Sequence, residues 1–140
     1  MLLKVKKLNP EAILPSYAHK GDAGLDLYSC EDCVIPAGER KIVSTGLSIE
    51  LPEGYVALVW DKSGIANNGI HCIAGVGDSG YRGEYKIVLL NTSKENYIIK
   101  KGNKIAQLLI QPIVTAEIEE VGNLSESERG DGAFGSTGVN

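Results

Sequence analysis

The sequence predicts an all-β fold built from short strands, and three observations support this prediction. Apolar and polar residues alternate with a period of two in several short segments, which is typical of strands with one buried face. Clusters of Gly, Pro, Asn, Asp and Ser separate these segments at short intervals, as in a β-sandwich or a β-barrel. No segment keeps a helical period long enough for a helix bundle.

Size and composition limit the class of protein. A chain of 140 residues with 43% hydrophobic and 23% charged residues is typical of one soluble globular domain. A net charge of -4 argues against a dedicated nucleic-acid-binding protein but is compatible with a small anionic ligand. The sequence has no apolar run of membrane-spanning length and no signal-peptide core near Met1, so we expect a cytoplasmic protein without a membrane partner.

The first half of the chain predicts strands that end at turns. The alternating residues 3–6 predict a short strand, and 25–28 predicts the next. In this second strand Leu25 and Leu27 share one face, so Asp26 faces either solvent or a functional site. Further strands are expected at the following segments, of which the first three end at Gly-containing turns: 33–35, 41–43, 47–50 and 55–60.

A break in the strands follows at 61–67, where one or two helical turns are expected before the Asn68-Gly69 turn. Here Lys62 supplies a cation and Ser63 a hydroxyl beside free backbone N–H groups, a combination that suits a phosphate. An exposed loop with one lysine is the alternative interpretation.

The central segment predicts a hairpin of strands 70–73 and 85–90, joined by the Gly-rich connection 74–84. Asp-Ser-Gly in this connection is ordinary turn chemistry. A hairpin, however, requires neither the carboxylate of Asp78 nor the aromatic ring of Tyr81 on the same loop, and glycines allow a close backbone approach. We therefore expect a pocket at this connection.

Strands are also expected at 97–99, 104–110 and 117–121, and these complete a folded body of residues 1–123. Gln107 lies within an apolar strand, so its amide is either satisfied in the core or contacts a ligand.

The last segment, 124–140, is rich in Gly and polar residues and predicts a flexible arm. It contains the only Phe of the chain, Phe134, between Arg129 and the hydroxyls of Ser136 and Thr137. An aromatic ring, a guanidinium and two hydroxyls could close over a base and its phosphates, whereas the alternative is a disordered terminus.

The three cysteines lack the even number and spacing of a disulfide framework, which favours a reducing compartment. Cys30-x-x-Cys33 together with His71-Cys72 could form a zinc site, although no second C-x-x-C or H-x-x-x-H is present.

Five of these segments, taken in order, resemble the trimeric deoxyuridine triphosphate nucleotidohydrolases (dUTPases) over nearly the whole chain. The five segments are AGLDL at 23–27, DKSGIA at 61–66, GVGDSGYRGE at 75–84, KGNKIAQL at 101–108 and RGDGAFGSTG at 129–138. The resemblance implies a jelly-roll-like β-barrel assembled as a homotrimer, in which two subunits form each pocket and the arm of the third closes it. It also implies Mg²⁺-dependent hydrolysis of dUTP to dUMP and pyrophosphate, which keeps uracil out of DNA and supplies dUMP for thymidylate synthesis.

The resemblance assigns roles to individual residues. Asp78 would be the general base that activates the water attacking the α-phosphorus, and Tyr81 would exclude a 2′-hydroxyl. Asp26 would contact Mg²⁺ in the outer shell, through water. The substrate-binding residues that the resemblance implies, besides Asp78 and Tyr81, are Lys62, Ser63, Gly64, Gly75, Val76, Lys86, Gln107, Arg129, Phe134, Gly135, Ser136 and Thr137.

Four positions depart from the family pattern. Lys62 replaces the usual Arg, so an ammonium group stands in place of a planar guanidinium that could bind a phosphate through two hydrogen bonds. Gly77 replaces the usual Ile or Val and Gly80 a frequent Asp, and both changes are expected to loosen the hairpin. Ala133 replaces a Gly of the arm.

Two other functions are compatible with the same scaffold. A dCTP deaminase, or a bifunctional relative, would need a further catalytic carboxylate for attack on the base. A non-catalytic nucleotide-binding regulator would bind dUTP without releasing pyrophosphate.

Overall fold

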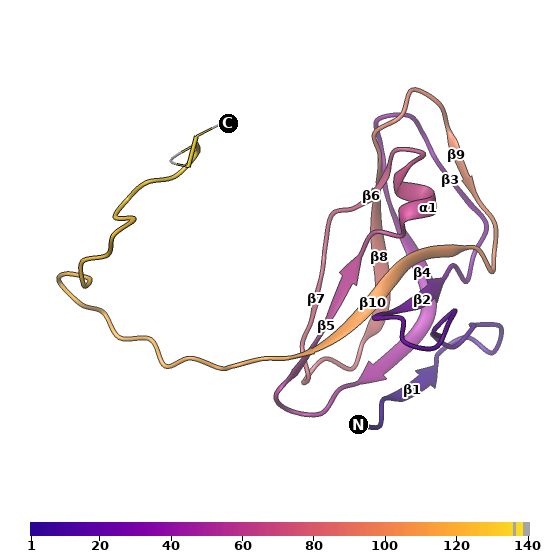
Figure 1. Cartoon of the computed structure of the whole chain (residues 1–140). Coiled ribbons are helices and arrows are strands. Elements are labelled where there is room, and N and C mark those ends of the chain that lie inside the picture. Colours follow the sequence, from indigo (N-terminus) through magenta and orange to yellow (C-terminus); the bar gives the residue numbers. More distant parts are fainter. Residues whose placement is uncertain (136, 139–140) are drawn as a thin grey trace.

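The computed structural model, which describes residues 1–135, 137 and 138, confirms the all-β prediction (Figure 1). The described residues form short strands and one helical turn, α1 (Ser63–Ala66). The strands are β1 (Lys4–Lys7), β2 (Gly24–Tyr28), β3 (Cys33–Ile35), β4 (Arg40–Glu50), β5 (Tyr55–Trp60), β6 (Ile70–Cys72), β7 (Val76–Gly77), β8 (Glu84–Asn91), β9 (Tyr97–Ile99) and β10 (Lys104–Pro112).

The strands form two four-stranded antiparallel sheets and one two-stranded ribbon. The first sheet has the order β1-β4-β8-β6, the second β2-β10-β5-β7, and the ribbon pairs β3 with β9. Most neighbours in these sheets are far apart in the sequence, as in a jelly roll. The two sheets pack against each other without closing into a barrel in the described residues, so the fold is jelly-roll-like.

A single core lies between the sheets and follows the period of two. Along β8 the side chains of Tyr85, Ile87, Leu89 and Asn91 are buried, and those between them are less so. The buried Asn91 is satisfied, because its amide donates to the carbonyl oxygens of Ile35 at 2.9 Å and Glu95 at 2.7 Å. From the opposite sheet the core receives, among others, Leu25, Leu27, Ala57, Ile105, Ala106 and Leu108.

One predicted turn is instead a bulge within a continuous strand. Residues 41–43 and 47–50 were expected as two strands, but both belong to β4, whose register with β8 shifts between Ser44 and Ser48. Gly46 takes a φ of 67° there. The Glu84 carboxylate accepts the Ser44 hydroxyl and, at 2.9 Å, the Gly46 N–H. The bulge can therefore stay inside the sheet with its polar groups satisfied.

The predicted central hairpin is confirmed, since β6 and β8 pair antiparallel with Ile70 opposite Asn91. Its connection does not stay in this sheet. The two residues of β7 pair with Ala57 and Leu58 of β5, in the second sheet. The Gly-rich connection thus links the two sheets.

The expected strand at 117–121 is wrong for this chain. After Pro112 the described residues contain no helix or strand, and the chain leaves the body in an extended path (Figure 1). The side chains of Val114 and Ile118 are 93% and 97% exposed. A strand needs a neighbouring edge to satisfy its backbone groups, and residues 117–121 pair with no edge in the described chain.

The α-helical content is a single short turn, and no helix among the described residues has the length and apolar character needed to cross a membrane.

Two adjacent residues of β9 test the assignment of the core. Ile99 is 1% exposed and belongs to the core, whereas Ile98 is 61% exposed. Ile99→Ala should lower the free energy of unfolding by about 2–5 kcal/mol, because it removes buried methylenes and leaves a cavity. Ile98→Ala should change it by less than about 0.5 kcal/mol. Guanidinium titrations at equal protein concentration measure both, and equal effects would contradict the packing described.

Candidate active site

The predicted pocket exists beside the edge strand β7. It has a volume of about 280 Å³, and the predicted residues Gly75, Val76, Tyr81 and Lys86 all line it. Asp78 follows β7 directly and is exposed, and its carbonyl oxygen accepts the Tyr81 N–H at 3.1 Å. Segments 75–78 and 81–86 are thereby brought to one place, with a carboxylate next to the pocket wall.

The strand β7 presents backbone groups to this pocket. It pairs with β5 on one side only, and it ends the second sheet in the described part of the chain. The Gly75 carbonyl accepts the Val59 N–H at 3.1 Å, which uses one of its two lone pairs. An unpaired strand edge in a pocket can donate to and accept from a planar heterocycle.

Tyr81 is fixed although it is 46% exposed. Its hydroxyl donates to the Glu84 carbonyl at 3.0 Å, and its ring meets the ring of Tyr85 edge-on. A Cβ at Gly83 would lie 2.8 Å from a ring carbon of Tyr81, so only glycine at 83 allows this placement. The Tyr81 ring is therefore a rigid part of the pocket wall.

Gly77, one of the two glycines expected to loosen the hairpin, leaves no gap in the structure. Gly77 is buried, and the ring of Tyr85 occupies the space where a side chain at 77 would lie. At Gly80, by contrast, an added Cβ would meet nothing within 4 Å.

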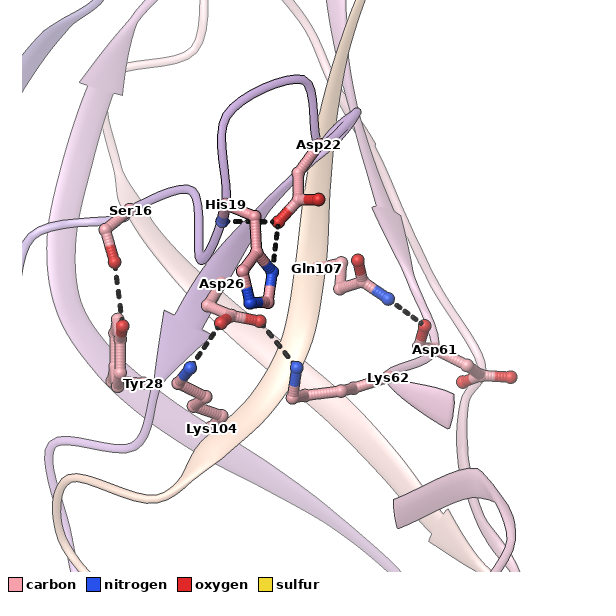
Figure 2. Close-up of polar contacts among 9 residues, drawn as sticks. All are labelled: Ser16, His19, Asp22, Asp26, Tyr28, Asp61, Lys62, Lys104 and Gln107. Atoms are coloured by element: carbon pink, nitrogen blue, oxygen red, sulfur yellow. Dashed lines mark hydrogen bonds and ion pairs between the residues drawn. The ribbon is translucent and has the colours of Figure 1, made fainter. Parts of the chain in front are cut away.

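Asp26 is the most buried charge near the site, at 3% exposed, so its expected solvent-facing alternative is wrong. Its Oδ1 accepts a hydrogen bond from Lys62 Nζ at 2.8 Å, and its Oδ2 forms an ion pair with Lys104 Nζ at 2.7 Å (Figure 2). The backbone of Ser16 forms an antiparallel β-bridge with that of Asp26 and covers the outer edge of β2 there. Burial acts to raise the pKa of Asp26, but the two lysines outweigh it and hold this pKa below its ordinary value.

The lysine at 104 was not predicted from the sequence. It lies 78 positions after Asp26, at the start of β10, where the register places it opposite Tyr28. The available indication was general: a carboxylate in a strand covered on both faces requires a cation nearby.

The loop that precedes α1 is held by Asp61. The Asp61 carboxylate accepts the Cys72 N–H at 2.5 Å and lies 2.6 Å from His71 Nδ1. Burial acts to raise the pKa of Asp61, but these two partners hold it below its ordinary value. Ser63 and Gly64 begin the helical turn beyond it and are exposed, so the predicted phosphate-binding groups lie at the surface.

Gln107 is half-buried, and its amide nitrogen has a partner in the protein. Its amide donates to the Asp61 carbonyl at 3.1 Å. A Cβ at Gly24 would lie 2.5 Å from the Gln107 side-chain oxygen, so glycine at 24 makes room for this amide. Strand β10 is thereby joined to the loop before α1 and to β2.

The arm residues do not join the pocket in the single chain. Arg129, Phe134, Gly135 and Thr137 are exposed on a segment that runs away from the sheets (Figure 1). The Arg129 guanidinium donates to the Gly132 carbonyl at 2.9 Å, a bond within the arm. Ser136 lies outside the described residues.

The cysteines are free thiols, and the described residues contain no group of three or more His, Cys, Asp or Glu side chains arranged to hold a metal. Burial, with a smaller contribution from Asp61, raises the pKa of Cys72 to about 12. This thiol is therefore protonated at neutral pH in the metal-free chain.

Comparison with known proteins points to one family. The sequence model of the family dUTPase matches residues 10–138. A deoxyuridine 5′-triphosphate nucleotidohydrolase of Clostridioides difficile is 53% identical over 97% of both chains. One of the same name from Nautilia profundicola is 51% identical over 99% of both.

Solved structures agree with the sequence comparison. A Staphylococcus bacteriophage 80alpha dUTPase with dUPNHPP superposes with a TM-score of 0.92, at 35% identity and 99% coverage of both chains. A mutant dUTPase from phage phi11 of S. aureus, whose structure describes a structural Mg(II) ion, superposes with a TM-score of 0.84. That match has 29% identity and covers 90% of this chain and 100% of the phage chain.

The Asp26 cluster predicts a defined acid dependence of stability. Because the pKa of Asp26 is lowered in the folded chain, its contribution is complete above the ordinary value of 3.8 and is lost as pH falls through the lower folded value. Asp26→Asn should lower the unfolding free energy by about 2 kcal/mol at pH 7, because hydrogen bonds to a charged group contribute about this much. The partners of Asp26, Lys62 and Lys104, are partly exposed. The difference from wild type should shrink below about pH 4.

Denaturant titrations from pH 7 to about pH 2.5 measure this dependence. The exposed Asp131→Asn is the control and should leave the unfolding free energy unchanged at every pH. A difference between wild type and Asp26→Asn that grows toward low pH would contradict the ionised cluster.

Proposed function

The chain belongs to the dUTPase family and is a dUTP diphosphatase, and we propose that it hydrolyses dUTP in the pocket beside β7 with Asp78 as the general base. One observation carries this proposal: Asp78 is joined directly to the backbone-lined edge strand that forms the pocket wall. The products, dUMP and pyrophosphate, follow from attack at the α-phosphorus.

Uracil is recognised by the backbone around Gly75 and Lys86. Both residues line the pocket, and main-chain groups cannot rotate to suit another base. Cytosine exchanges the donor and acceptor pattern of uracil, so a site made of fixed main-chain groups leaves it wrongly paired. Thymine adds a methyl group that a closely fitting pocket rejects by contact.

Tyr81 selects deoxyribose. Its ring cannot move aside easily, because the bond to the Glu84 carbonyl and the contact with Tyr85 hold it on both sides. A ring packed under the sugar leaves no space for a 2′-hydroxyl, which favours the deoxynucleotide.

The phosphates bind at the start of α1. Ser63 and Gly64 offer a hydroxyl and N–H groups that have no intrahelical partner at this end. Gln107 keeps the loop in place through Asp61. Lys62 can turn from Asp26 to a phosphate, because Lys104 remains to neutralise the buried carboxylate.

Mg²⁺ fits this site as an ion carried by the triphosphate. Lys104 stays on the Asp26 carboxylate when Lys62 turns to a phosphate, so we assign this carboxylate a role through water and not as a direct ligand. Phosphate oxygens and waters are the ligands that this hard cation prefers, and they need no cage of protein carboxylates. When bound, Mg²⁺ neutralises charge on the phosphates.

The chemical step is a hydrolysis. The Asp78 carboxylate accepts a proton from a water molecule, whose oxygen forms a bond to the α-phosphorus. The bond from this phosphorus to the α,β-bridging oxygen breaks, and pyrophosphate leaves with that oxygen. The neutral Asp78 then releases its proton to solvent.

We further propose that the site is complete only in a homotrimer, with residues 1–123 as the body and 124–140 as an arm that closes the site of another subunit. Apolar side chains such as Val114, Ile118 and Leu124 are 88–97% exposed in the single chain, which is typical of surfaces that a partner covers. Arg129, Phe134, Gly135, Ser136 and Thr137 would then hold the γ-phosphate and stack on uracil. The free cysteines favour a cytoplasmic location.

Substitution of the proposed general base, Asp78, tests the mechanism. Asp78→Asn should lower kcat by a factor on the order of 10²–10⁴, because an amide cannot accept the proton of the water. Binding of a non-hydrolysable dUTP analogue, measured by calorimetry, should change little. Asp32→Asn, which changes a carboxylate outside the pocket, serves as the matched control. Turnover retained by Asp78→Asn would remove Asp78 as the base.

Mixed trimers test the shared site. A chain ending at Leu124 should lose at least about tenfold in kcat/KM, since base stacking alone is worth about 1–3 kcal/mol. Truncated and Asp78→Asn chains, each nearly inactive, are then unfolded and refolded together.

If the arm acts on another subunit, about a quarter of the sites in the mixture combine an intact Asp78 with an intact arm, and activity returns to about that fraction. Truncated chains refolded alone are the control. An arm that closes its own subunit's pocket would give no recovery on mixing.

A further inference from the structure

The pocket wall contains a second tyrosine, Tyr85, for which the proposed mechanism has no role. Tyr85 is the second residue of β8, is 5% exposed and lines the same pocket as Tyr81. The two ring centroids are 5.7 Å apart, with an interplanar angle of 64°. This edge-to-face geometry is favourable and orients both rings.

The Tyr85 ring is complementary in shape to Gly77. A Cβ built on Gly77 would lie 2.8 Å and 2.9 Å from two ring carbons of Tyr85 and closer still to its hydroxyl oxygen. No other residue at 77 can coexist with the ring in this position, so each of the two residues depends on the other.

This contact joins the two sheets directly beside the proposed base. Gly77 belongs to β7 in the second sheet, Tyr85 belongs to β8 in the first, and Asp78 is the residue after Gly77. The strand β7 has only two residues and few ladder bonds of its own. Its position therefore depends on what packs against it.

The Tyr85 hydroxyl is buried and has no hydrogen-bond partner among the described residues. Burial, with smaller contributions from Asp78 and Tyr81, raises the pKa of Tyr85, so the phenol is neutral at pH 7. The contacts that fix Tyr85 in the pocket wall are therefore those of its ring.

We propose that Tyr85 is a positioning residue for hydrolysis. Its ring packs on the backbone of Gly77 and holds β7 in the pocket wall at the position that places Asp78 for proton transfer. This inference rests on the proposed role of Asp78. Displacement of a catalytic group by about 1 Å can cost on the order of a hundredfold in rate. The effect therefore falls on kcat more than on KM.

The experiment is a double-mutant cycle on the full-length protein, with kcat and KM for dUTP and the melting temperature of each variant. Tyr85→Val should lower kcat by about 10–100-fold with KM within about threefold, because β7 loses its support. Gly77→Val should lower kcat at least as much, since the new side chain collides with the ring. The double variant should recover kcat to within about fivefold of wild type, because valine at 77 fills the space vacated by the ring.

Two further variants separate positioning from general stability. Tyr85→Phe keeps the ring and should keep kcat within about threefold, which assigns the effect to packing and not to the hydroxyl. Tyr97→Val changes a half-buried tyrosine that packs on the core from β9, and should lower the melting temperature without lowering kcat. Should Tyr85→Val fail to fold, Tyr85→Leu carries the test with the same expected direction.

The proposal is overturned if Tyr85→Val keeps wild-type kcat, if the double variant recovers nothing over folded single variants, or if Tyr85→Phe is as impaired as Tyr85→Val. These outcomes are distinct from failure of the proposed function. Turnover retained by Asp78→Asn would remove the base itself, whereas an inactive Asp78→Asn beside a fully active Tyr85→Val would remove only the role of Tyr85.

Discussion

The passage of the chain from one sheet to the other between β6 and β8 is the constraint on which the rest of the site depends. Strands β6 and β8 pair in the first sheet, yet β7 between them pairs with β5 in the second. The connection must therefore cross the edge of the core, expose one side of its backbone and return. That crossing forms one wall of the pocket and places Asp78 directly after the wall residue Gly77. A simple tight turn between β6 and β8 would do neither.

A second constraint fixes the phosphate side of the site around one buried charge. Asp26 on β2 draws in Lys62 before α1 and Lys104 on β10, while Gln107 ties β10 to the same loop (Figure 2). Three segments that are distant in the sequence are thus held together electrostatically and by hydrogen bonds. Two cations on one carboxylate leave a net positive charge, which suits a site for a triphosphate.

How far the sequence predicts this structure depends on the range of the interactions. Local alternation was enough for most strands, and the break in it before Asn68-Gly69 was enough for the helical turn. A Gly-rich connection with Asp78 and Tyr81 was enough to locate the pocket. The bulge at Gly46 was missed because its partner, Glu84, is 38 residues away and a local Ser-Thr-Gly pattern is also typical of a turn.

The same limit explains the other differences. The strand expected at 117–121 has an alternating pattern but pairs with no strand in the described chain, and the alternation of residues does not show which edge, if any, a segment reaches. We expected Gly77 to loosen the hairpin because glycine is flexible by itself, but the alternation of residues does not show that the ring of Tyr85 fills the space beside it. Functional sites are where such local expectations fail most often, since several segments must meet there.

The exposure of the proposed catalytic and phosphate-binding residues in the single chain explains why the arm, residues 124–140, belongs to the proposed mechanism. A carboxylate can activate one water efficiently only if the site excludes bulk water and orders the reacting phosphate. In one chain Asp78, Ser63 and Gly64 are exposed, and so is the side chain of Phe134. The segment that carries Phe134 runs away from the sheets (Figure 1). In the proposed mechanism the body supplies uracil recognition and the general base Asp78, and in the single chain no other described segment covers these groups. A flexible segment with one aromatic ring and one guanidinium can supply that cover after the nucleotide has entered, and its exposure in the single chain is the condition that lets it reach a neighbouring subunit.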